Sequence, residues 1–90
     1  MEERNDEMLE FMITAILADY DLMGLIAKGR PHDEYGPEAR TILRYIIEED
    51  YNVKLDVLAK KIRYILEIWF SRTFKLKYCI MIANEIKKML

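Results

Sequence analysis

Residues 29–40, GRPHDEYGPEAR, interrupt an otherwise helical pattern and decide where the first helix ends and the next begins. The segment holds both prolines, two of the three glycines, the only histidine and three carboxylates. Glycine and proline end helices, whereas proline at the first helical position favours a new one. The segment therefore predicts a corner between two helices, in which Gly29 and Pro31 end the first helix and Pro37 begins the second.

Upstream of this corner, the sequence predicts a helix over residues 5–28 with Asn5 as its N-terminal cap. The apolar side chains of this helix spread around most of its circumference, which indicates burial on more than one side. Asp19 is the exception, because it lies opposite the polar stripe. Either the helix breaks near residues 18–21, ADYD, where Asp19 or Asp21 caps a new turn, or Asp19 is a buried, paired carboxylate. The pattern favours the break.

Downstream of the corner, three more helices are predicted, and with the first they make an all-α fold, a compact array of four helices in a single domain, residues 1–90. Their approximate ranges are 37–50, 55–70 and 73–89. Asn52 suits the left-handed turn that ends the second helix. The third helix has the clearest periodicity, with apolar residues at Leu55, Leu58, Ile62, Ile65 and Trp69. Residues 71–83 also alternate like a strand, but the absence of a partner strand favours helix.

Composition bounds the setting of the protein. Hydrophobic residues make up 52% of the 90 positions, a surplus that suggests a second burial surface, most simply a homodimer. With one cysteine the chain forms no internal disulfide, which is typical of the cytoplasm. The segment 8–27 has the length of a membrane span, but Asp19 and Asp21 would each cost about 2.5–3.5 kcal/mol on insertion. We therefore expect a buried soluble helix and no membrane contact.

Charge is divided unevenly along the chain. Residues 1–53 carry 5 basic and 13 acidic side chains, whereas residues 54–90 carry 9 basic and 3 acidic ones. Two halves that pack against each other and attract would explain this division. A basic face for an anionic partner is the alternative. The first explanation is favoured, because the sequence pI of 5.4 is far from that of most nucleic-acid-binding domains.

Two short runs, Tyr20-Asp21-Leu22-Met23-Gly24 and Pro31-His32-Asp33-Glu34-Tyr35, flank the loop before the second predicted helix. Through these runs, the segment 14–45 resembles the YugE-like family of small, uncharacterised helical proteins. Two positions depart from the family pattern, because Tyr20 stands where tryptophan is usual and Leu22 where proline is usual. The resemblance implies a compact array of four helices. It implies no activity.

The corner is interpreted as a structural clamp formed by Asp21, Asp33, Glu34 and Tyr35. Asp33 and Glu34 precede a helix start, where carboxylates can accept hydrogen bonds from unpaired amides and face the positive end of the helix dipole. Tyr35 can bury its ring while its hydroxyl finds a polar partner such as Asp21. The clamp is expected to join the end of the first helix to the start of the second.

Catalytic and metal chemistry find little support. Carboxylates and one histidine, at Asp19, Asp21, His32, Asp33 and Glu34, are of ligand type but lack any recognised metal spacing. Cys79 lies in an apolar run, where a buried thiol is usually inert. No glycine-rich phosphate loop is present. We therefore predict no enzyme activity, no metal site and no cofactor.

Nucleic-acid binding is the alternative function, with the second and third helices as a helix-turn-helix. The residues that would face the anion are Lys54, Lys60, Lys61, Arg63, Arg72, Lys75 and Lys77. Against this, lysines on an amphipathic helix are usually its solvated face. The acids of the preceding connection, EEDYNVK at 48–54, would also repel DNA.

The favoured function is a small cytoplasmic protein–protein interaction module that forms a homodimer or binds another protein. Six methionines and a first helix that is apolar on most sides would suit an association surface. The first and last helices are expected to carry the contact.

Overall fold

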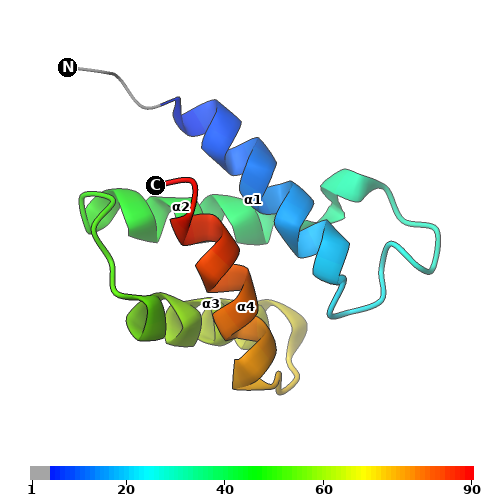
Figure 1. Cartoon of the computed structure of the whole chain (residues 1–90). Helices are drawn as coiled ribbons and strands as arrows, with labels where there is room; N and C mark the ends of the chain where they lie inside the picture. Colours follow the sequence, from blue (N-terminus) through cyan, green and yellow to red (C-terminus); the bar gives the residue numbers. More distant parts are fainter. Residues whose placement is uncertain (1–4) are drawn as a thin grey trace.

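The computed structural model describes residues 5–90, apart from the side chain of His32. Within that range all regular secondary structure is helical (Figure 1). In chain order they are α1 (Asp6–Tyr20), the short 3-10 helix η1 (His32–Tyr35), α2 (Gly36–Glu48), α3 (Leu55–Phe70) and α4 (Leu76–Lys87). The predicted all-α array of four helices is confirmed. The predicted ends of the helices are less accurate. They differ from the structure where contacts with other segments determine the residue at which a helix begins or ends.

Helix α1 ends at Tyr20, eight residues before the end of the predicted range 5–28. Asn5 caps its start as predicted, because its side chain accepts the backbone N–H of Met8 at 3.0 Å. At the other end Asp21 adopts a left-handed conformation with φ 47°, which stops the helix. The predicted break near residues 18–21 is therefore confirmed. The alternative of a buried Asp19 is wrong, since that residue is exposed.

The connections on either side of α2 differ from prediction by small shifts. The helix begins at Gly36, with Pro37 in its first turn, and ends at Glu48. The left-handed residues that follow are Asp50 (φ 54°) and Tyr51 (φ 61°), and Asn52 is not among them. The backbone N–H of Tyr51 reaches back to the carbonyl of Ile46 at 2.9 Å, which closes the helix earlier than a turn at Asn52 would.

Helix α3 has the predicted bounds, and Ser71 ends it in a left-handed conformation with φ 53°. Helix α4 starts at Leu76 instead of residue 73. Residues 73–75 are not helical, because a contact with α3 holds this segment. The backbone N–H of Phe74 donates to the carboxylate of Glu67 at 3.1 Å, and the Phe74 ring is buried. Residues 76–87 are helical, so the strand interpretation of this region is wrong.

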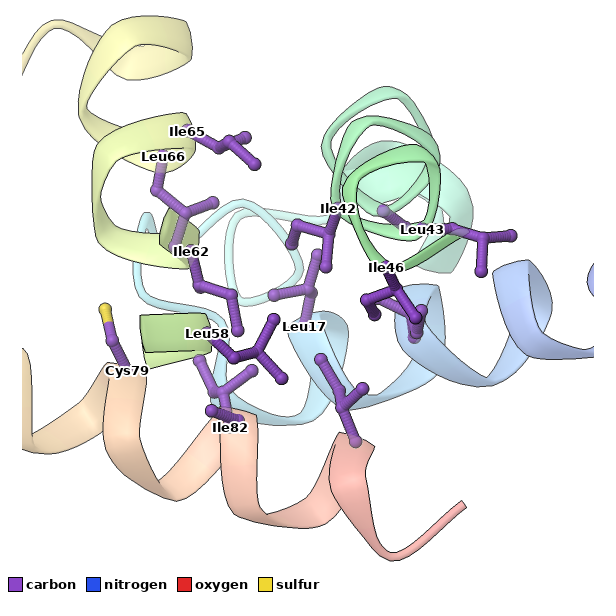
Figure 2. Packing of buried hydrophobic residues seen from close by; sticks show 14 of the residues in the cluster. Leu17, Ile42, Leu43, Ile46, Leu58, Ile62, Ile65, Leu66, Cys79 and Ile82 are labelled. Atoms are coloured by element: carbon purple, nitrogen blue, oxygen red, sulfur yellow. The ribbon is translucent and has the colours of Figure 1, made fainter. Parts of the chain in front are cut away.

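The core is made where side chains from all four helices meet. Helix α1 packs mainly on α2, and α3 mainly on α4. Figure 2 shows Leu17, Ile42, Leu58, Ile62 and Ile82 pointing toward one another from these four helices. Trp69 was predicted on the inward face of α3 but is 51% exposed. It lies in the last turn of that helix. A side chain on the inward face of a helix is buried only where another segment packs over it.

Candidate functional site

The carboxylate of Asp21 organises the segment that follows α1, drawn in cyan in Figure 1. Its Oδ1 accepts the backbone N–H of Ile26 at 3.1 Å, and its Oδ2 accepts that of Ala27 at 3.0 Å. These amides belong to a tight turn in which Gly24 and Gly29 have positive φ values of 69° and 90°. Glycine adopts this conformation without a steric penalty. The hydrogen bonds to the Asp21 carboxylate can therefore stabilise the turn without opposing backbone strain at these two positions.

Tyr35, the last residue of η1, completes this arrangement from the other side of the corner. Its hydroxyl donates to Oδ1 of Asp21 at 2.6 Å and accepts the backbone N–H of Met23 at 3.2 Å. Its ring is 2% exposed and lies edge-on to Phe70, with the ring centroids 6.1 Å apart. One tyrosine therefore ties the end of α1 to the start of α2 and packs against the end of α3.

Electrostatics strengthen the contact between these two side chains. Burial alone would raise the pKa of Asp21, but hydrogen bonds from Tyr35, Ile26 and Ala27 outweigh it and hold this pKa below its ordinary value. Burial and the hydrogen bond to Asp21 raise the pKa of Tyr35 to about 12. At neutral pH the pair is therefore an ionised acceptor and a neutral donor, which gives a short, charge-assisted hydrogen bond.

The other two residues of the predicted clamp lie outside it. Asp33 is exposed, and its side chain makes no hydrogen bond within the described part of the chain. Glu34 lies 4.0 Å from the exposed Arg30, a weak surface ion pair. The physical reason is the 3-10 geometry of η1, in which residues three apart share a face. With Tyr35 pointing inward, the two preceding side chains must point elsewhere.

Glu38, in the first turn of α2, is a buried carboxylate. It is 4% exposed, and Oε2 has no hydrogen-bond partner among the residues described. Burial raises its pKa, its own backbone N–H opposes this, and the nearby Glu34 adds to the rise. Its spacing from Ile42 and Ile46 places it within the buried arc of α2, and this periodicity could have identified it.

An open groove of about 850 Å³ runs along the outer side of α1, beside η1 and the first turns of α2. Its apolar lining comes from Phe11, Ala15 and Pro37. Four carboxylates line it as well, those of Glu7, Glu10, Asp19 and Asp33. Arg40 is the cation in this lining, and its Nε already lies 3.2 Å from Oε1 of Glu10. The groove is therefore lined by exposed apolar side chains together with acidic ones.

A second exposed apolar region lies where α1 meets the end of the chain. A hollow of about 460 Å³ is lined by Asn5, Met8, Leu9, Met12, Lys88 and Met89. Met8 is 52% exposed and Met12 37%. On the outer side of α4, Ile80 and Met81 are also exposed. Apolar side chains are thus presented by both the first and the last helix.

The seven basic residues proposed to face an anion do not form one stripe. The ammonium group of Lys61 lies between two rings, 5.1 Å from the centroid of Tyr45 and 5.3 Å from that of Tyr64. Arg72 contacts the sulfur of Met23 at 3.7 Å, and Lys77 lies over its neighbour Tyr78. The remaining four are Lys54, Lys60, Arg63 and Lys75, of which all but the half-buried Arg63 are exposed. At about 100° per residue, Lys60 and Arg63 lie three residues apart on one side of α3, whereas Lys61 points to another side.

Nucleophilic and metal chemistry have few suitable groups. Cys79 is fully buried, and burial raises the pKa of its thiol to about 11, so it stays protonated at neutral pH. Within the described residues, no three side chains of His, Cys, Asp or Glu gather closely enough to hold a metal ion. The side chain of His32, a candidate ligand, lies outside the described residues.

No helix in the described range is both long enough and apolar enough to cross a membrane. In comparisons with known proteins, no family model matches the chain, and no curated protein or solved structure shows significant similarity to it. The resemblance to the YugE-like family stays a prediction.

Proposed function

We propose that the protein is a small cytoplasmic interaction module, without enzyme activity, that forms a homodimer through α1 and α4. The observation that supports this most is the hollow between α1 and the end of α4, where Met8, Met12 and Met89 line one apolar surface. Methionine is flexible and polarisable, and exposed methionines are common at protein-binding surfaces. Exposed apolar side chains that cluster in this way are typical of interaction sites.

The charges of the two helices support a reciprocal contact. Helix α1 carries Asp6, Glu7, Glu10 and Asp19 and no basic residue. Helix α4 carries Lys77 and Lys87, is followed by Lys88, and has Glu85 as its acid. In a two-fold dimer, α1 of each protomer against α4 of its partner would pair opposite charges twice. Pairing α1 with α1 would instead oppose like charges.

Sedimentation equilibrium over a range of concentrations tests this proposal. We expect a dimer at about 50 µM, a concentration at which even a contact of modest affinity is largely formed. Met12→Glu should weaken the dimer at least about tenfold, because it places a carboxylate in the apolar hollow of an acidic helix.

Ile68→Glu is the matched control. Ile68 is also an exposed apolar residue, at 59% compared with 37% for Met12, but it lies on α3 outside the hollow. This variant should remain a dimer. A wild-type protein that sediments as a monomer at about 50 µM, or a Met12→Glu variant that dimerises as tightly as Ile68→Glu, would contradict the proposal.

Nucleic-acid binding through residues 54–77 is the alternative, and the dispersed directions of its basic side chains give it less support. It would require duplex DNA to bind with an affinity that falls steeply as salt is added. Charge-removing variants of the exposed Lys54, Lys60 and Lys75 should then reduce binding. A mobility-shift titration with these variants decides between the two functions.

A further inference from the structure

We infer that the groove between α1 and the start of α2 binds a basic amphipathic helix of a partner protein. This inference adds a second surface to the proposed function, and it holds whether or not the chain forms a dimer. It rests on the shape of the groove, the exposure of its apolar side chains and the charge of its acidic ones.

The shape of the groove fits a short helix. Its lining follows α1 from Glu7 to Asp19, a rise of about 18 Å at 1.5 Å per residue. About three turns of a second helix have the same length. The groove is open along its side and has a volume of about 850 Å³. Long open grooves of this kind accept the apolar face of an amphipathic helix.

Phe11 supplies the apolar anchor of the groove. Its side chain is 72% exposed, the highest value among the large apolar residues of the described chain. Ala15, one turn later on α1, and Pro37, on α2, continue this surface. An aromatic side chain left in water in this way gains the free energy of burial only when another surface covers it.

The acidic side chains of the groove select the charge of the occupant. Glu7, Asp19 and Asp33 are exposed carboxylates, and none of the three has a side-chain partner among the described residues. Arg40 is already paired with Glu10. A partner helix with lysine or arginine beside its apolar stripe would meet three unpaired acids, whereas an acidic helix would be repelled.

A second copy of this chain fits the groove less well than a foreign helix does. The most suitable basic element would be α4, but its Cys79, Ile82 and Ile86 are fully buried in its own core. That face could enter a groove only if the core opened, and the outer face of α4, with the exposed Ile80 and Met81, is the one proposed for the dimer contact. A separate amphipathic segment needs no such rearrangement.

Fluorescence anisotropy with a designed peptide tests the inference. The probe is a labelled peptide of about 14 residues, with leucine along one helical face and lysine on the other. A peptide with the same leucines and glutamate in place of lysine is its control. We expect the lysine peptide to bind at least about tenfold more tightly, and its affinity to fall between about 0.1 M and about 1 M salt, where the Debye length shrinks from about 10 Å to about 3 Å.

Variants at exposed positions locate the binding without unfolding the protein. Phe11→Ala and the double variant Asp19→Asn with Asp33→Asn should each weaken binding of the lysine peptide at least about tenfold. The matched controls lie on α3, where Trp69 is an exposed aromatic and Asp56 an exposed acid outside the groove. Trp69→Ala and Asp56→Asn should bind as the wild type does. Thermal melting checks that all variants are folded.

Three results would overturn the inference. Equal affinity for the lysine and glutamate peptides would remove the role of charge. Equal losses in the groove and control variants would show nonspecific attraction to an acidic protein. Peptide binding that disappears as the protein dimerises would show that a second copy occupies the groove. The dimer experiment uses Met12, outside this lining, so the two proposals can fail separately.

Discussion

At the scale of single residues, Tyr35 and Asp21 determine how the corner holds together. The tyrosine hydroxyl bridges a carboxylate at the end of α1 and the backbone N–H of Met23, while its ring fills space beside Phe70. A hydrogen bond to a charged group contributes more to stability than one between neutral groups. Loss of this hydroxyl should therefore be measurable.

Tyr35→Phe should lower the free energy of unfolding by about 1–2 kcal/mol, because it removes the donor to Asp21 and leaves the amide of Met23 without its acceptor. Urea denaturation measures the change. Tyr64→Phe, on a side chain that is 57% exposed, serves as the control and should be neutral. Asp33→Ala should also be close to neutral, because Asp33 lies outside the contact. A large loss of unfolding free energy in Asp33→Ala would show that Asp33 does contribute to the clamp.

Glu38 leads to a prediction about pH. A carboxyl whose pKa is raised on folding is ionised at a cost, so the folded state loses stability as pH rises above the ordinary value of 4.5. Glu38→Gln removes that ionisation and should stabilise the protein at pH 7 by about 1 kcal/mol, with a smaller gain at pH 4. Melting temperatures at the two pH values, compared with those of the exposed Glu48→Gln, provide the measurement. An equal gain at both pH values would argue against the ionisation.

At the scale of elements, three of the turns between helices depend on residues in left-handed conformations. Asp21, Asp50 and Ser71 all have positive φ, which is costly for residues with a side chain. Asp21 offsets this cost with the hydrogen bonds of its carboxylate. Ser71 has no side-chain hydrogen bond among the described contacts, so no such bond offsets the steric cost of its conformation.

Ser71→Gly should therefore raise the free energy of unfolding by about 0.5–1 kcal/mol, since glycine adopts this conformation without strain. Guanidinium denaturation tests it. Ser71→Ala is the control, because alanine keeps the steric penalty and should give no gain. If the glycine variant were less stable than wild type, the added freedom of the unfolded chain would outweigh the relief of strain.

At the scale of the whole molecule, the four helices are held by one apolar cluster. Ile62 is fully buried within it, near Leu58 and Ile82 (Figure 2). Ile62→Ala should cost about 2–5 kcal/mol, because it leaves a cavity in a closely packed core. Ile68→Ala on the exposed side of the same helix should change little. Equilibrium unfolding of both variants tests whether α3 is oriented as described, since similar losses would contradict it.

Parts of the fold could be predicted because they depend on local signals. Asn5 caps α1 through its own side chain, and the spacing from Leu55 to Ile65 specifies the buried face of α3. The Tyr35–Asp21 contact was also foreseeable, since a tyrosine and an acid flank one corner. Asp33 and Trp69 were misplaced for one reason. Their surroundings depend on the angle of η1 and on where neighbouring helices end, which no local pattern contains.

The sequence by itself determined the all-α fold class. Helical periodicity, and the glycines and prolines between the helices, influence the backbone only within a few residues and so can be read locally. Only the tertiary structure decided which residue within the predicted break ends α1, that Oε2 of the buried Glu38 has no hydrogen-bond partner among the described residues, and that an acidic groove with Phe11 exposed lies beside α2. Each of these depends on the distance between segments far apart in the chain. Burial and the electric field of a site are sums over such neighbours, so they exist only once the helices have packed.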